Sequence, residues 1–167
     1  TDFFLISYMV DSKTGKLFSK TYINALQKII DYIYHLTDIQ GNYPTYGDDD
    51  DGRVVIFENN SDSYNNFMSI ITSGYLLFGD DKYLSKSYIS SDVKNMLLFG
   101  KKCYNQLANK NIPVPKNGSK FYPKEGHFIS KFSFKNYKEI YIHFNAAPLG
   151  YLSIAAHGHA DALSFIF

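Results

Sequence analysis

Two histidines near the end of the chain, His157 and His159, have the types and the spacing best suited to a catalytic or metal-binding site. In an extended strand, His157, His159 and Asp161 share one face, because successive side chains alternate between faces. Neighbouring positions on that face lie about 6.6 Å apart, so both imidazoles can serve one site. Asp161 lies about 13 Å from His157 on the same count, which is too far for one shared metal ion without a bend.

His-x-His is a metal-ligand spacing, but a catalytic zinc usually takes three protein ligands and an open position. The alternative is a pair of strand histidines that hydrogen-bond to the backbone. The other histidines, His35, His127 and His143, are isolated in the sequence. We expect His35 to be a packed or surface residue of a helix, and His143 to alternate with Tyr141 in a strand.

Four consecutive aspartates between Gly47 and Gly52 form the second candidate site. A calcium-binding EF-hand loop needs a bidentate Glu at its twelfth position, and counting from Asp48 that position holds Asn59, so this class is excluded. The default interpretation is a solvated acidic turn with Arg53 as its counter-ion. The alternative is a loop that contacts a sugar or a cation, with Asp48, Asp50 and Arg53 as the substrate-binding residues.

The composition excludes several classes of protein. Of 167 residues, 45% are hydrophobic and 17% aromatic, which is too apolar for a disordered chain and sufficient for a core. We expect most of the aromatic side chains to lie in that core. The net charge of +1 argues against a nucleic-acid partner. Residues 1–108 carry 10 basic and 13 acidic side chains, and residues 109–167 carry 7 and 3, so the second part accepts an anionic ligand more readily.

The cysteine content and the ends of the chain limit the interpretation further. Cys103 is the single cysteine, which excludes an intramolecular disulfide and a thiolate metal cluster. No apolar run approaches the roughly 20 residues that span a bilayer, so we expect no membrane span, and the chain does not begin like a signal peptide. Residue 1 lies inside a helical pattern and the last residues have strand-like types. We therefore expect a piece of a larger protein.

The hydrophobic pattern predicts helices first and strands second, an α+β protein. Helices are expected over 2–10, from an N-cap at Ser19 to a stop at Gly41, over 62–78 with a stop at Gly79, and over 91–108. Residues 109–118 have the composition of a linker. Strands are then expected over 128–134, 140–145 and 163–167.

Three segments together resemble a known family. They are the run from Tyr43 to Arg53, the short Ala147–Pro148–Leu149–Gly150 segment, and the string from His157 to Phe165, which continues His-Gly-His-Ala-Asp as Ala-Leu-Ser-Phe. In this order and spacing they resemble the heparinase II/III-like polysaccharide lyases. The string that begins at His157 is fairly specific, and the aspartate loop is moderately so.

The resemblance implies a fold and a reaction. Residues 1–108 would be the C-terminal part of an α/α toroid, 109–118 a linker, and 119–167 the first strands of an antiparallel β-sandwich. These lyases cleave acidic polysaccharides that contain uronic acid, such as heparan sulfate or alginate, by β-elimination. By the family pattern His157 is the catalytic histidine that assists at the uronate, and His159 is a ligand of a structural zinc. A periplasmic or secreted location is implied in the same way.

The same resemblance implies what this chain lacks. The catalytic tyrosine and its Asn or His partner would precede Thr1, and the remaining zinc ligands would follow Phe167. We therefore expect the chain alone to be inactive, to bind zinc weakly or not at all, and to self-associate through an exposed strand edge near Phe167. Two alternatives stay open: a non-catalytic carbohydrate-binding or polysaccharide-assembly protein on the same fold, and a helical-plus-β interaction domain with structural histidines.

Overall fold

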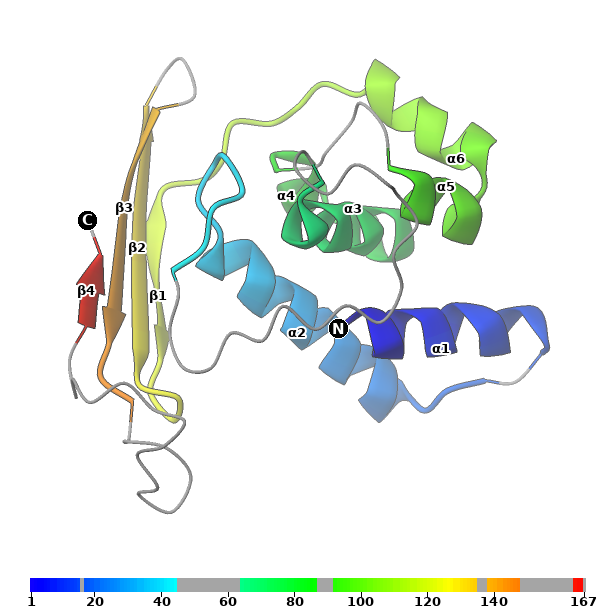
Figure 1. Ribbon diagram of the computed structural model, residues 1–167, viewed down its shortest axis with the longest axis horizontal. Coiled ribbons are helices and arrows are strands. Elements are labelled where there is room, and N and C mark those ends of the chain that lie inside the picture. Colours follow the sequence, from blue (N-terminus) through cyan, green and yellow to red (C-terminus); the bar gives the residue numbers. More distant parts are fainter. Residues whose placement is uncertain (16, 45–63, 87–91, 135–137, 148–163, 167) are drawn as a thin grey trace. The chain divides into compact units, whose positions relative to one another are not determined.

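The structure is a computed structural model, and it describes residues 1–15, 17–44, 64–86, 92–134, 138–147 and 164–166. The chain is of the α+β class: helices come first and an antiparallel sheet follows (Figure 1). It divides into two compact units, Thr1–Tyr34 with Arg53–Pro113 and His35–Gly52 with Val114–Phe167. The assignment of these parts to a toroid and a sandwich stays a prediction.

The first unit contains the helices. They are α1 (Asp2–Lys13), α2 (Lys20–Leu36, which ends in the second unit), α3 (Asn66–Phe78), α4 (Asp81–Leu84), α5 (Val93–Phe99), α6 (Lys101–Asn105) and the 3-10 helix η1 (Gln106–Asn109). The helices expected over 2–10, after Ser19 and before Gly79 are confirmed. The Ser19 Oγ accepts a hydrogen bond from the Tyr22 N–H at 3.2 Å, as expected of an N-cap. Gly79 ends α3 with φ +69°.

Two predicted helix boundaries are wrong, each for a local reason. The helix α2 ends at Leu36 and not at Gly41, because the Asp38 carboxylate accepts the backbone N–H groups of Gln40 and Asn42, both at 2.8 Å, and turns the chain. The helix expected over 91–108 is broken at Gly100, whose φ of +91° ends α5 before α6 begins. The short helix α4 was not predicted.

The core of the helical unit is aliphatic and tyrosine-rich. Its buried members are Leu5, Leu26, Ile30, Ile33, Tyr34, Ile70, Ile71 and Tyr83. A Cβ at Gly74 would lie 2.6 Å from the Ile30 Cγ2, so this glycine lets α3 approach α2 closely. An ion pair of 2.9 Å joins the buried Lys94 of α5 to the buried Asp2 of α1. These contacts fix α1, α2, α3 and α5 to one another.

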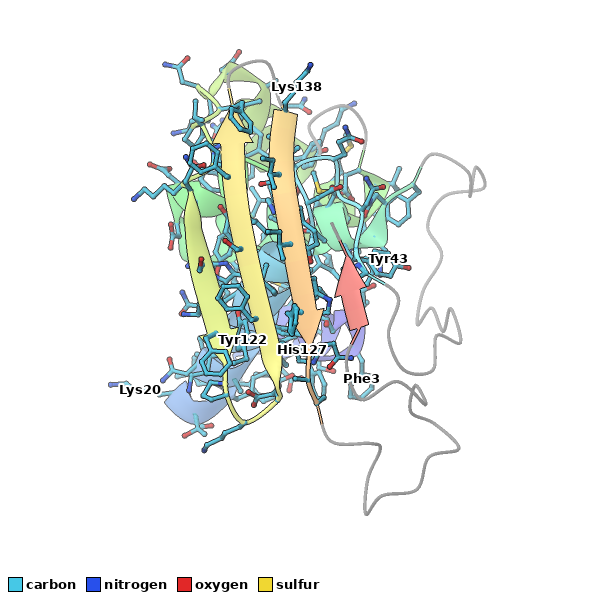
Figure 2. All side chains as sticks on the ribbon, turned by 90° about the vertical axis from the view of Figure 1, so that its left-hand side faces the viewer. Phe3, Lys20, Tyr43, Tyr122, His127 and Lys138 are labelled. Atoms are coloured by element: carbon cyan, nitrogen blue, oxygen red, sulfur yellow. The ribbon has the colours of Figure 1, made fainter. Side chains whose placement is uncertain are left out.

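The second unit contains one antiparallel sheet in the order β1-β2-β3-β4, which Figure 2 shows face on. Its strands are β1 (Gly118–Tyr122), β2 (His127–Phe134), β3 (Lys138–Asn145) and β4 (Ser164–Ile166). The three predicted strands are confirmed to within two residues. The strand β1 was not predicted, and it begins at Gly118, in the last position of the expected linker.

The two faces of the sheet differ in burial. One face, here the histidine face, carries His127, Ile129, Lys131, Ser133, Glu139, Tyr141 and His143. The opposite face, here the phenylalanine face, carries Phe121, Phe128, Phe132, Phe134, Ile140 and Phe144. On the histidine face His127, Ile129 and His143 are buried, whereas every named residue of the phenylalanine face is exposed. The expected aromatic core is found in part: Tyr34 and Tyr83 are buried in the helical unit, and Phe67 and Phe78 are partly buried against it.

Candidate functional site

The residues that the sequence singled out lie outside the described part of the structure. This applies to His157 and His159, and to Asp48, Asp50 and Arg53 of the aspartate loop. Their predicted roles are therefore untested. Within the described residues, three other arrangements of polar groups are candidates for a site.

The first arrangement is a pair of imidazoles at one end of the β2–β3 hairpin. Gly126 precedes β2 with φ +73°, and a Cβ there would lie 2.6 Å from backbone atoms of Ala146 and Ala147. The Gly126 carbonyl accepts the Ala146 N–H at 2.8 Å. Glycine is thus required at this position, where the ends of β2 and β3 meet, and it places His127 as the first residue of β2 (labelled in Figure 2).

The strand register brings His127 and His143 onto one face. His143 lies opposite Ile129 and His127 lies opposite Asn145, so the two histidines are diagonal neighbours. The His127 Nδ1 is 2.9 Å from the His143 Nε2, and the two ring planes are nearly parallel at 14°. The exposed fractions are 5% for His127 and 1% for His143. One ring therefore donates its N–H and the other accepts it.

Burial makes both imidazoles hard to protonate. It lowers the pKa of His143 to about 4, and a charge on the neighbouring His127 would lower it further. Burial also lowers the pKa of His127, against an opposing effect of the Glu125 charge. Both rings are therefore neutral at pH 7, the form that ligates metals and accepts protons. Among the described residues, however, no group of three or more His, Cys, Asp or Glu side chains could hold a metal ion.

Sequence reasoning missed this pair because it treated His127 and His143 as isolated. They are 16 residues apart, and no spacing rule joins residues that far apart. The signal that could have found them is the hairpin register: once β2 and β3 are paired about a short turn, alternation places both histidines on the same face. The register of β2 against β3 is set by the turn between them, and the sequence patterns do not predict the geometry of that turn.

The second arrangement lies on the histidine face near the other end of the hairpin. A cavity of about 310 Å³ is lined by Asp38, Ile39, Gln40, Lys138, Glu139 and Tyr141. Its groups are engaged with residues 36–39: Glu139 Oε2 accepts the Ile39 N–H at 2.8 Å, and the Tyr141 hydroxyl donates to the Leu36 carbonyl at 2.7 Å. Lys131 also donates to the Thr37 carbonyl. We conclude that these side chains fasten the segment to the sheet.

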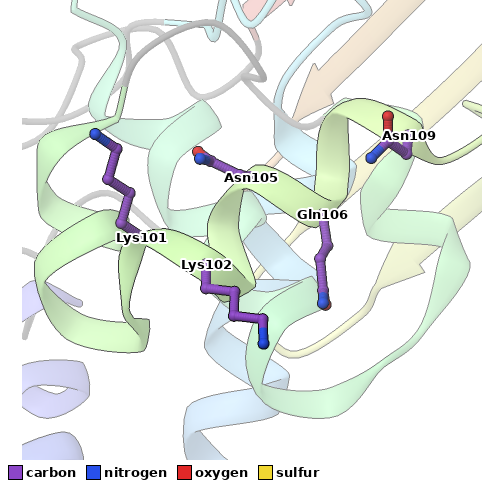
Figure 3. Close-up of a pocket in the computed structure, with 5 residues that line it drawn as sticks. All are labelled: Lys101, Lys102, Asn105, Gln106 and Asn109. Carbon is purple, nitrogen blue, oxygen red and sulfur yellow. The ribbon is translucent and has the colours of Figure 1, made fainter.

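The third arrangement is a polar stripe on α6 and η1, drawn in Figure 3. Its members are the exposed residues Lys101, Lys102, Asn105, Gln106 and Asn109, which line a shallow cavity of about 410 Å³. The spacing of four residues places Lys101, Asn105 and Asn109 on one side of the ribbon and Lys102 and Gln106 on the other. Ammonium and carboxamide groups can together bind carboxylates and hydroxyls. The stripe is therefore suited to an acidic, hydroxyl-rich ligand.

Two further results bear on function. None of the described helices has both the length and the apolar character that crossing a bilayer requires. In the comparisons with known proteins, no family model, no curated protein and no solved structure matches the chain.

Proposed function

We propose that this chain is part of a polysaccharide lyase that cleaves an acidic, uronic-acid-containing polymer by β-elimination. The observation that carries the proposal is the string from His157 to Phe165, preceded at the expected spacing by the aspartate loop. The described order of elements agrees with it, because helices precede an antiparallel sheet at the position where the resemblance requires that change.

The proposed chemistry assigns His157 a role at the uronate. In β-elimination a base removes the proton next to the carboxylate, the bond to the glycosidic oxygen breaks, and an acid protonates the departing oxygen. The carboxylate charge must be neutralised for that proton to become acidic. An imidazole that donates a hydrogen bond to the carboxylate supplies part of this neutralisation, which is the role we propose for His157.

The proposed zinc is supported by the donor type only. A zinc ion would stabilise the fold by fixing its ligands to one another, and a neutral imidazole such as that of His159 is an ordinary zinc ligand. A single ligand does not make a site, and no step of the reaction is derived through the metal. The remaining ligands are proposed to belong to the rest of the protein.

The polar stripe supports the proposed substrate class. Lys101 and Lys102 carry the positive charge that a polymer of uronic acids would require, and the carboxamides of Asn105, Gln106 and Asn109 can bind its hydroxyls. The excess of basic residues after residue 108 also favours an anionic polymer as the substrate.

The test is an assay of the full-length protein on a series of uronic-acid polymers, followed by the ultraviolet absorbance of the unsaturated uronate. We expect absorbance to rise on at least one polymer. His157→Ala should reduce the rate at least 100-fold, a typical loss for a group that stabilises charge in the transition state. His35→Ala, outside the proposed site, is the matched control and should retain the rate. No absorbance on any polymer, with zinc supplied, would refute the lyase.

A second candidate is a non-catalytic protein that binds the same class of polymer, and the polar stripe is the observation that favours it. The two candidates differ in one result. A binding protein would be retained on an immobilised acidic polymer, and released by Lys101→Glu with Lys102→Glu, without producing unsaturated ends. Retention with no new absorbance would select the binding function.

A further inference from the structure

Asn117 is the single asparagine of the chain that is followed by a glycine. A backbone nitrogen can attack the side-chain carbon Cγ of the asparagine before it, and the side chain of the residue that carries this nitrogen hinders the attack. Gly118 has no side chain, so its nitrogen can approach the Asn117 Cγ without that hindrance. The sequence therefore makes Asn117 the asparagine best suited to a reaction with its own backbone.

The structure places this pair of residues at the start of the sheet. Asn117 precedes β1, whose pairing with β2 begins at Gly118, opposite Lys131. Asn117 and Gly118 are both exposed. A Cβ built on Gly118 would meet no atom of the described residues within 4 Å. Water, which the reaction below consumes, can therefore reach this peptide bond.

A hydrogen bond from the neighbouring strand polarises the carboxamide of Asn117. Its Oδ1 accepts the backbone N–H of Ser133, in β2, at 2.6 Å. When a nitrogen adds to Cγ, negative charge develops on this same oxygen, and a fixed N–H donor stabilises that charge. The Ser133 N–H is therefore placed to promote attack on the Asn117 Cγ.

We propose that Asn117 is a site of spontaneous deamidation, in which the Gly118 nitrogen displaces the side-chain amide and closes a succinimide ring. The Gly118 nitrogen gives its proton to water or hydroxide and forms a bond to the Asn117 Cγ. The bond from Cγ to Nδ2 breaks, and Nδ2 leaves as ammonia with a proton taken from water. A water molecule then opens the ring. Opening at Cγ yields aspartate, and opening at the backbone carbonyl carbon yields isoaspartate.

Either product changes the start of the sheet, and neither depends on the lyase proposal. Both replace a neutral carboxamide with a carboxylate. Aspartate keeps an oxygen that can accept the Ser133 N–H. In isoaspartate the main chain passes through Cβ and Cγ, which adds one carbon before Gly118, so the hydrogen bond to Ser133 and the pairing of Gly118 with Lys131 cannot both keep their geometry. We expect isoaspartate to weaken the pairing of β1 with β2.

The test is incubation of the folded, full-length protein at mildly alkaline pH, followed by mass analysis of its peptides. The peptide that contains Asn117 should gain about 1 Da, because an amino group is replaced by a hydroxyl, and should separate into aspartate and isoaspartate forms. Asn145 is the internal control. Its Oδ1 also accepts a backbone N–H, from Ala147 at 3.0 Å, but the residue that follows it is Ala146. The Asn145 peptide should keep its mass over the same time.

Gly118→Ala is the matched variant. Gly118 does not have a left-handed φ, and its Cβ position is open, so the strand should tolerate alanine. The added methyl group hinders the attacking nitrogen and should slow the gain in mass by about tenfold or more. Three results would overturn the proposal: an Asn117 peptide that keeps its mass, equal rates at Asn117 and Asn145, or a rate at Asn117 that Gly118→Ala leaves unchanged.

Discussion

The two faces of the β2–β3 hairpin bury the opposite of what their residue types predict. The histidine face buries two imidazoles around Ile129, whereas the phenylalanine face exposes aromatic rings to solvent. The histidine face also carries the side chains that hold residues 36–39. Residues 36–39 bond to Lys131, Glu139 and Tyr141 on the histidine face. Apolar character alone therefore does not decide which side chains of this sheet are buried.

The largest effect that separates the two faces should come from removing a buried side chain. Ile129→Ala empties a site that is 1% exposed, and we expect the free energy of unfolding to fall by about 2–4 kcal/mol. Phe132→Ala is the matched control on the other face, and it should change the free energy by less than about 0.5 kcal/mol. Both are measured by urea unfolding at a concentration where the chain is monomeric. Equal losses at the two positions would contradict the difference in burial.

The second-largest effect is expected from acid, which should lower the free energy of unfolding by protonating the buried histidines. The pKa of His143 is about 4 in the folded chain and about 6.5 when unfolded, so the unfolded state binds the proton first as the pH falls. The stabilisation is complete above pH 6.5 and is lost as the pH falls toward 4. The loss amounts to about 2–3 kcal/mol, and the lowered pKa of His127 adds to it in the same direction.

This prediction is measured by urea unfolding at a series of pH values. The control is His143→Gln, which keeps a neutral polar group next to His127 but does not titrate. The difference between the two proteins isolates the imidazole from the carboxylates that titrate in the same range. If the two proteins lose stability in parallel between pH 6.5 and 4, His143 does not titrate as described.

A smaller effect is expected from the hydrogen bonds that join residues 36–39 to the sheet. Tyr141→Phe removes the hydroxyl that donates to the Leu36 carbonyl at 2.7 Å and should cost about 1 kcal/mol. The same change at Tyr8, whose hydroxyl has no hydrogen bond within the described ranges, is the control and should be close to neutral. Thermal unfolding of both variants provides the measurement. A neutral Tyr141→Phe would mean that other bonds hold residues 36–39.

Much of the fold could be predicted from the sequence, because helices and strands follow local patterns. Ser19 and Gly79 predicted helix ends correctly, since capping depends on a few adjacent residues. The helix break at Gly100 was missed because apolar residues continue past it at helical spacing. Strand β1 was missed because Gly118, Ser119 and Lys120 have no strand-like types, and pairing with β2 makes this segment a strand.

The site was less predictable, for a physical reason. The His127 and His143 pair depends on a hairpin register that brings residues 16 positions apart into contact. The polar stripe of α6 and η1 depends on the helix break that was missed. The exposure of the phenylalanine face is a property of tertiary packing, which local sequence patterns do not contain. His157 and His159 remain predictions from their spacing and from the resemblance.

The pairing of β3 with β4 has a consequence for how this protein could be engineered or could evolve. Asn145 at the end of β3 lies opposite Ser164 at the start of β4, so the chain leaves the sheet and returns to it at adjacent positions. Two antiparallel neighbours can be joined by a loop as short as two residues. The pairing of β3 with β4 therefore does not require a connection of any particular length between Asn145 and Ser164. A shorter connection should therefore leave the order of the strands unchanged.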